Sequence, residues 1–126
     1  MNRLWICTAV VLALLGTTMA NSRYIDRTVK LLTDDLSYAH SEAHQGNWSK
    51  ASRLTGQALE RWTEHDAYLH IMLPHRDIDE ILLIFREVEQ YLALEEADQY
   101  NAANAKLVAQ LELLSEMEQL TLKNVL

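Results

Sequence analysis

Apolar residues recur along the chain at alternating intervals of four and three, which is the repeat of an amphipathic helix. The first stripe of this kind contains Ile25, Val29, Leu32, Leu36, Ala39 and Ala43. It predicts a helix over about residues 22–45. Gly46 can adopt the left-handed conformation that ends a helix, and the side-chain oxygen of Asn47 can cap the next helix. The sequence therefore predicts a tight helix-to-helix turn at this point.

The same spacing predicts a second helix and a third. The second begins at Trp48, carries Trp62 and His65 on its apolar stripe, extends to about Met72 and is closed by Pro74. The third begins at Asp77, a residue type that caps helices well. Its predicted inner face consists of Ile78, Ile81, Leu82, Phe85, Val88 and Leu92.

A fourth helix follows a loss of phase near residues 94–97, with Asp98 as its expected cap. Its predicted face includes Ala105, Leu107, Val108, Leu111, Leu114 and Met117. Residues 120–126 change in character, with Thr121 as a candidate cap and an apolar ending. We expect this last segment to fold back onto the other helices.

The stretches 46–51 and 97–102 each place a capping residue four positions before an alanine, which indicates two related helical hairpins. Short connections make neighbouring helices antiparallel, because a short loop cannot carry the chain back to a parallel start. The predicted fold is therefore all-α, with an N-terminal signal or anchor helix followed by an antiparallel four-helix bundle built from two helical hairpins.

The first twenty residues differ from the rest because they lack a polar face. Arg3 precedes an uncharged run over residues 4–20, and Thr18 and Ala20 provide the small residues that a signal peptidase requires. The 17 residues of that run, as a helix, would reach about 25 Å, just short of a typical hydrocarbon core. A signal peptide cleaved after Ala20 and a retained single-span anchor both fit residues 1–20. A buried helix of a soluble fold fits less well.

Residues 21–126 are predicted to form one extracytoplasmic helical domain, either secreted after cleavage or held at the cell membrane by a single span. Basic residues lie on both sides of the apolar run, with Arg3 before it and Arg23, Arg27 and Lys30 after it. The positive-inside rule therefore does not decide the orientation. A short N-terminal tail followed by the whole domain fits export better.

Composition excludes several classes of function. The chain has 126 residues and a net charge of -7, and its 11 basic residues are scattered singly, so nucleic acid is not an expected partner. Its single cysteine, Cys7, lies inside the apolar run and can build neither a disulfide framework nor a zinc site. The three glycines form no phosphate-binding fingerprint. No cofactor is predicted, and no nucleophile motif points to an enzyme.

Two groups of histidines are weak candidates for ligand or metal binding. His40 and His44 stand one helical turn apart, but a metal site needs a third ligand and the sequence offers none nearby. We expect solvated histidines close to a helix end. His75, with Asp77 and Asp79, forms a corner that could organise a turn, sense pH or bind a small ligand. Organisation of the turn is the favoured interpretation.

Trp48 and Trp62 lie on roughly the same side of their helix, where the usual role of tryptophan is in the core. Trp48 stands at the first position of its helix and is expected to be partly exposed. With Tyr100, from the turn that echoes its own, it is a candidate for an aromatic contact patch.

Several segments together resemble one bacterial family. They are the Gly46-Asn47-Trp48 turn followed by Ala51 and Trp62, the stretch 75–79 (HRDID) and the ending 122–126 (LKNVL), after an N-terminal apolar segment. The chain is similar over essentially its whole length to the short, membrane-anchored helical family called the domain of unknown function numbered four-three-six-three. The positions that match the family's recurrent residues are Trp62, His75, Ile78, Asp79 and Asn124. The resemblance implies a helical fold and a membrane location and brings no catalytic residues.

These features predict a non-enzymatic interaction or structural module that docks to another envelope or membrane protein. Amphipathic helices without assembled chemistry are the basis for this expectation. The alternative is a small-ligand or metal-binding helical domain that uses the histidine and aspartate corner at residues 75–79.

Overall fold

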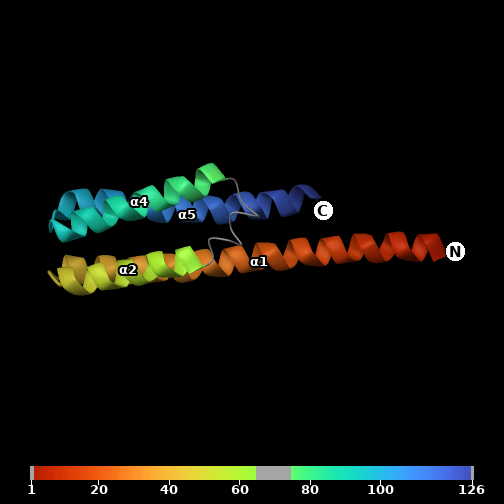
Figure 1. The fold of residues 1–126 in the computed structure, drawn as a ribbon. Coiled ribbons are helices and arrows are strands. Elements are labelled where there is room, and N and C mark those ends of the chain that lie inside the picture. The colour runs from red at the N-terminus through yellow and green to blue at the C-terminus, as the bar shows by residue number, and fades with distance from the viewer. Residues whose placement is uncertain (1, 65–74, 126) are drawn as a thin grey trace.

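Four helices make up the described part of the computed structural model, residues 2–64 and 75–125 (Figure 1). They are α1 (Asn2–His44), α2 (Trp48–Glu64), α4 (His75–Ala93) and α5 (Ala97–Val125). The helix α1 lies beside α2 and α5, and α4 also lies beside α2 and α5. The helices α1 and α4 therefore lie diagonally opposite each other in the bundle, and so do α2 and α5. The predicted antiparallel bundle of two hairpins, α1–α2 and α4–α5, is confirmed.

The helix α1 is longer than the amphipathic pattern predicted. It starts at Asn2 rather than near Ser22 and continues without a break for 43 residues (Figure 1). The expected start was wrong because the run before Ser22 has no polar face, so it shows no amphipathic period although its Leu, Ala and Val residues are compatible with a helix. The two parts of the sequence therefore form one rod.

Burial changes abruptly along that rod. Residues 2–20 are almost entirely exposed, whereas Ser22 and Ile25 are already buried against the other helices. The exposed part is long and apolar enough to cross a membrane, a test that a signal sequence near an N-terminus also passes. The exposed apolar segment therefore joins directly to the bundle.

The core of the bundle follows the predicted stripes closely. All six residues predicted on the first stripe are buried, as are Trp62 and five of the six predicted on α4; Leu82 is only partly buried. On α5 the residues Leu107, Leu111 and Leu114 are buried, but Ala105 and Met117 are exposed. The fully buried Tyr100 and the nearly buried Asn104 lie on the inner face of α5 and were not predicted there.

The two hairpins repeat each other at an offset of 49 residues. On α1 and α4, five buried residues correspond in this register: Val29 with Ile78, Leu32 with Ile81, Leu36 with Phe85, Ala39 with Val88 and Ala43 with Leu92. On α2 and α5, Thr55 corresponds in the same way with Asn104. The predicted relation between 46–51 and 97–102 therefore exists, but its register was wrong: the sequence placed the second segment two residues too late along the chain.

Both hairpins turn through the same backbone motif. After α1, Gly46 has a φ of 86°, Gly46 N donates to Ala43 O and Asn47 N donates to Glu42 O. After α4, Glu95 has a φ of 54°, Glu95 N donates to Leu92 O and Glu96 N donates to Tyr91 O. This pair of bonds is the Schellman motif, which satisfies carbonyls left over at a helix end. We call the end of the bundle that holds both turns the tight-turn end.

The helix starts differ slightly from the predicted caps. Asn47 occupies the N-cap position, because its carbonyl accepts the first helical bond from Ala51 N. Glu96 holds the same position before α5, where Asp98 was expected. The helix α4 begins at His75, so Asp77 lies within the first turn and does not cap it. An acidic residue in the first turn still favours the helix through its dipole.

The C-terminal segment does not fold back. The helix α5 continues without interruption to Val125, past the candidate cap at Thr121. Its register along α1 is fixed where Ser115 Oγ donates to Asp26 Oδ1 over 2.8 Å and Gln119 Nε2 donates to the same oxygen over 3.2 Å. Because α5 runs antiparallel to α1 and continues beyond Gln119, its end extends past the start of the core to lie beside the exposed apolar part of α1 (Figure 1).

Candidate functional site at the tight-turn end

The two Schellman turns meet around a shared hollow of about 520 Å³ at the tight-turn end. The described residues that line it come from both hairpins: Glu42, Gly46, Asn47, Trp48, Ser49, Lys50 and Glu95. The predicted contact residue Trp48 and its aromatic partner Tyr100 lie at this end. The hollow is therefore the place where the features singled out in the sequence come closest together.

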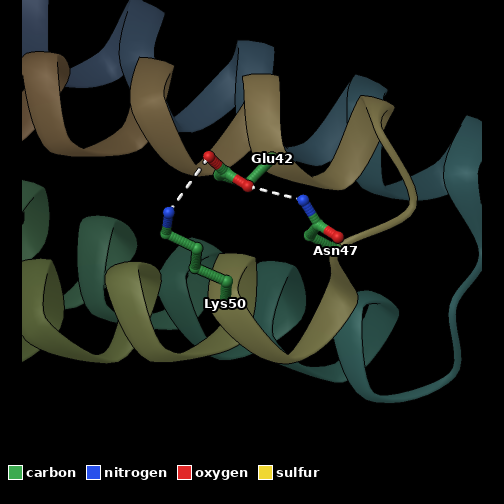
Figure 2. Close-up of polar contacts among 3 residues, drawn as sticks. All are labelled: Glu42, Asn47 and Lys50. Atoms are coloured by element: carbon green, nitrogen blue, oxygen red, sulfur yellow. Dashed lines mark hydrogen bonds and ion pairs between the residues drawn. The ribbon is translucent and has the colours of Figure 1, made fainter.

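Glu42 is the polar centre of the first turn (Figure 2). Asn47 Nδ2 donates to Glu42 Oε2 over 2.8 Å, and Lys50 Nζ donates to Glu42 Oε1 over 3.3 Å. The Glu42 side chain is only 12% exposed, so these contacts are partly shielded from water. The hydrogen bond from Asn47 is the main reason that the pKa of Glu42 lies below its ordinary value, with Lys50 and Tyr38 acting in the same direction. Glu42 is thus held ionised and does not serve as a proton donor near neutral pH.

Lys50 links this carboxylate to an aromatic ring. Its Nζ lies 5.2 Å from the centroid of the Tyr38 ring, within the range of a cation–π interaction. The hydrogen bond with Tyr38, followed by the contacts with Glu42, raises the pKa of Lys50 above its ordinary value. Three side chains from α1 and α2 therefore hold one positive and one negative charge in a fixed arrangement.

The predicted pair of Trp48 and Tyr100 does meet in the structure. The two rings pack edge to face with centroids 6.1 Å apart, and His40 stacks on Tyr100 at 5.9 Å. His40 Nε2 lies 3.0 Å from Asn101 Oδ1, at hydrogen-bond distance. This group joins α1, α2 and α5, so it ties the first hairpin to the second.

Tyr100 cannot contribute to a surface patch, because it is fully buried. Burial raises its pKa to about 12, and its hydroxyl has no hydrogen-bond partner among the described residues. Trp48 is partly exposed, as predicted. The surface that the tight-turn end presents is therefore Trp48 with the exposed Leu94 and Glu95 of the second turn, supported from below by Tyr100.

Of the histidine candidates, His40 and His44 are the two whose side chains the structure describes, and they are not brought together into a site. His40 is engaged with Tyr100 and Asn101, whereas His44 is exposed. Within 2–64 and 75–125 no group of three or more His, Cys, Asp or Glu side chains is placed to hold a metal ion. Asp77 is partly exposed and Asp79 is exposed in the first turns of α4. The side chain of His75, and the whole of His65, lie outside the described residues.

The Glu42 group was missed in the sequence. The signal was present, because Glu42 lies one turn before Gly46, Asn47 follows it by five positions and Lys50 by eight. A tight turn brings these positions together, so a carboxylate there can receive donors from the start of the next helix. The sequence gives the spacing but not the rotation of α2 about its axis, which decides whether Lys50 reaches back.

Comparison with known proteins agrees with this architecture. The family model described as a domain of unknown function, DUF4363, matches residues 19–125, which is nearly all of the bundle and the end of the apolar segment. The chain belongs to this family. No curated protein and no solved structure matches it. The predicted family is therefore confirmed, and this DUF4363 chain inherits no assigned reaction or ligand from it.

Proposed function

We propose that this DUF4363 chain is a membrane-anchored, non-enzymatic interaction module that presents the tight-turn end of its bundle, outside the cytoplasm, to another envelope or membrane protein. The observation that carries the proposal is the unbroken course of α1 from the exposed apolar segment into the core. A flexible linker would let the bundle move independently of its anchor. A continuous helix instead fixes the direction in which the bundle points.

The length of α1 supports display at a distance from the membrane. Residues 21–44 span about 36 Å at a rise of about 1.5 Å per residue. The tight-turn end would therefore stand well clear of the lipid head groups, where a folded partner can reach it. The opposite end of the bundle would lie next to the membrane.

The chemistry of the tight-turn end suits a protein partner. Leu94 is 55% exposed in the second turn, and the adjoining Glu95 lines one hollow together with Trp48 and Lys50. Apolar and aromatic contacts bordered by charges are typical of interface cores with polar rims. Glu95 also holds a left-handed conformation that costs a residue with a side chain roughly 1 kcal/mol, and such strain is concentrated at functional positions.

The polar groups of this end favour binding over catalysis. The Glu42 carboxylate is occupied by Asn47 and Lys50, and the His40 ring by Tyr100 and Asn101. A general base needs an accessible site and a pKa near the working pH. The lowered pKa of Glu42 takes it away from that range.

Site-specific photo-crosslinking in the native membrane tests the docking surface. A photoreactive side chain is placed at Ser49 or at Leu94, and in the control at Leu83, which is 69% exposed on the outer side of α4. We expect one discrete adduct from Ser49 and Leu94 and none from Leu83. Adducts from all three positions, or from Leu83 alone, would contradict docking at the tight-turn end.

Location is tested separately with a thiol reagent that does not cross membranes. Cys7 is the only cysteine, so C7S gives a background in which S49C reports on the tight-turn end alone. We expect S49C to be labelled in intact cells. Labelling only after the cells are opened would place the bundle in the cytoplasm.

A further inference from the structure

The junction between the apolar segment and the bundle carries three exposed basic residues. Arg23, Arg27 and Lys30 follow Ala20 closely, and all three are exposed. Their spacing of four and three puts them on one face of α1, opposite the buried stripe that begins with Ile25 and Val29. They therefore form a line of positive charge that starts where the apolar segment ends.

These three charges have no ion-pair partner in the described parts of the chain, although Lys30 lines a second hollow with the carboxylates of Asp26, Glu112 and Glu116. None of their side chains forms an ion pair or hydrogen bond with another residue in the parts of the chain that the structure describes, whereas Lys50 and Arg61 pair with Glu42 and Asp35. The nearest acidic residue, Asp26, points to α5, where it accepts hydrogen bonds from Ser115 and Gln119. The line of charge is thus available to an external anion, although the chain as a whole is acidic.

A hollow of about 420 Å³ adjoins the first two of these residues. Its described lining divides into two halves along α1. Gly16, Met19 and Ala20 form a small apolar half, and Arg23, Tyr24 and Arg27 form a polar half. A Cβ atom added at Gly16 would meet nothing within 4 Å, so the space above this glycine is open.

We propose that this junction binds an anionic phospholipid, whose phosphate is held by Arg23 and Arg27 and whose acyl chain lies over Gly16 and Ala20. The inference rests on the proposed function, because it needs residues 1–20 to be retained in the membrane. With Ala20 at the edge of the hydrocarbon, Arg23 and Arg27 stand about 4 and 10 Å above it, in and just beyond the head-group layer. Arginine suits this role because its guanidinium matches phosphate oxygens in a bidentate manner.

The three basic residues also determine how strongly the junction should prefer an anionic lipid. A basic residue near an anionic surface favours binding by about fivefold. Three such residues give roughly a hundredfold preference for an anionic lipid over a zwitterionic one. Salt at molar concentration should remove most of this preference, because the screening length then falls to about 3 Å.

The full chain, reconstituted in nanodiscs of equal parts phosphatidylglycerol and phosphatidylcholine, provides the test. Native mass spectrometry of the released protein counts the lipids of each kind that stay bound. The test variant is R23Q/R27Q/K30Q. Its matched control is R53Q/R86Q/K106Q, which removes the same charge from exposed positions beyond the junction. A further variant, G16L, fills the hollow and leaves every charge in place.

We expect phosphatidylglycerol to dominate on the wild-type chain and on the control, and to fall at least tenfold relative to phosphatidylcholine in R23Q/R27Q/K30Q. We expect G16L to retain less lipid of either kind. Equal binding of the two lipids by the wild type would overturn the proposal, and so would an equal loss in the test variant and its control. Unchanged lipid retention in G16L would remove the hollow from the site.

The same spectra separate this proposal from the proposed function. The intact chain has a mass of 14.5 kDa, so the spectrum reports whether residues 1–20 are still present. An intact chain without lipid preference refutes only the lipid site. A chain shortened after Ala20 refutes the retained anchor itself.

Discussion

Gly46 and Glu95 occupy the same position in the two hairpins, yet only one of them is glycine. Both lie in the left-handed region, with φ values of 86° and 54°, and both end a helix in a Schellman motif. A residue with a Cβ atom is strained in this conformation, whereas glycine is not. The second turn therefore holds strain that the first turn avoids.

Exchanging the residue types at these positions should have opposite effects. We expect Gly46→Ala to lower the free energy of unfolding by about 1 kcal/mol and Glu95→Gly to raise it by up to about 1 kcal/mol. Urea unfolding of the detergent-solubilised chain measures both. Gly56→Ala serves as a control, because Gly56 lies inside α2. Alanine is favoured over glycine within a helix, so we expect this variant to raise the free energy of unfolding by roughly 0.5–1 kcal/mol. A stabilising Gly46→Ala would show that the turn does not need the left-handed conformation.

Ionisation of Glu42 makes the stability of the tight-turn end depend on pH. Its pKa in the folded state lies below the ordinary value of 4.5, chiefly through the hydrogen bond from Asn47. The folded state therefore binds a proton less readily than the unfolded state does. The stabilisation is fully present above about the ordinary value and is lost as the pH falls through the lower, folded-state pKa.

The E42Q variant removes this titration. We expect the melting temperature of E42Q to lie below that of the wild type at pH 7. The difference should shrink as the pH falls below about 5, since the wild type then loses its ionised contacts. E87Q, which changes an exposed glutamate on α4, is the control and should follow the wild type at every pH. A difference in melting temperature between E42Q and the wild type that stays constant as the pH falls would argue against an ionic role for Glu42.

At the level of the helices, the bundle carries a buried polar layer whose side-chain oxygens lack hydrogen-bond partners among the described residues. Thr55 on α2 and Asn104 on α5 correspond in the 49-residue repeat, and Thr55 Oγ1 and Asn104 Oδ1 are both buried without a hydrogen-bond partner among the described residues. An unpaired buried polar group costs about 1–3 kcal/mol. Replacement by an apolar group of the same shape removes this cost.

We expect Thr55→Val to raise the free energy of unfolding by about 1 kcal/mol, because valine has the same shape and no hydroxyl to desolvate. Thr63→Val is the comparison, since Thr63 is exposed and its hydroxyl donates to Glu60 O. It should be close to neutral. Destabilisation by Thr55→Val would show that the hydroxyl is hydrogen-bonded in solution.

The helices also show how far the pattern of apolar residues predicts structure. The stripe from Ile25 to Ala43 identified every buried apolar residue of α1, because an amphipathic period marks the side that faces the other helices. It did not identify the buried polar residues Ser22, Thr28 and Glu42. The start of α1 could not be predicted in the same way, since a run that is apolar all round has no preferred face. The expected fold-back after Leu120 was wrong for a related reason: a change in composition does not by itself end a helix, and α5 continues to Val125.

The candidate site was predicted less completely than the fold. The contact of Trp48 with Tyr100 was expected, but Tyr100 proved to be core, because the second turn falls two residues earlier than the echo in the sequence implied. That shift moves Tyr100 from the surface of the turn to the inner face of α5. The Glu42 group was missed because its partners come from two helices whose relative rotation is set by packing.

In the whole molecule, one continuous helix joins the exposed apolar segment to the bundle, and we propose that it holds the two rigidly together. The proposed display of the tight-turn end depends on this rigidity. Burial begins at Ser22, two residues after Ala20, and the apolar core begins at Ile25. A hinge near residues 16–22 would separate the bundle from its anchor and remove the fixed orientation.

A distance between spin labels on the two sides of Ala20 measures whether α1 is rigid across this junction. In a C7S background the labels are placed at Leu4 and Arg27, both exposed, and the chain is reconstituted in nanodiscs. A continuous helix predicts a narrow distribution near 35 Å, from 23 residues at about 1.5 Å each. A broad or clearly shorter distribution would contradict the rigid connection, and loss of the Leu4 label from the mature chain would show that the anchor is removed.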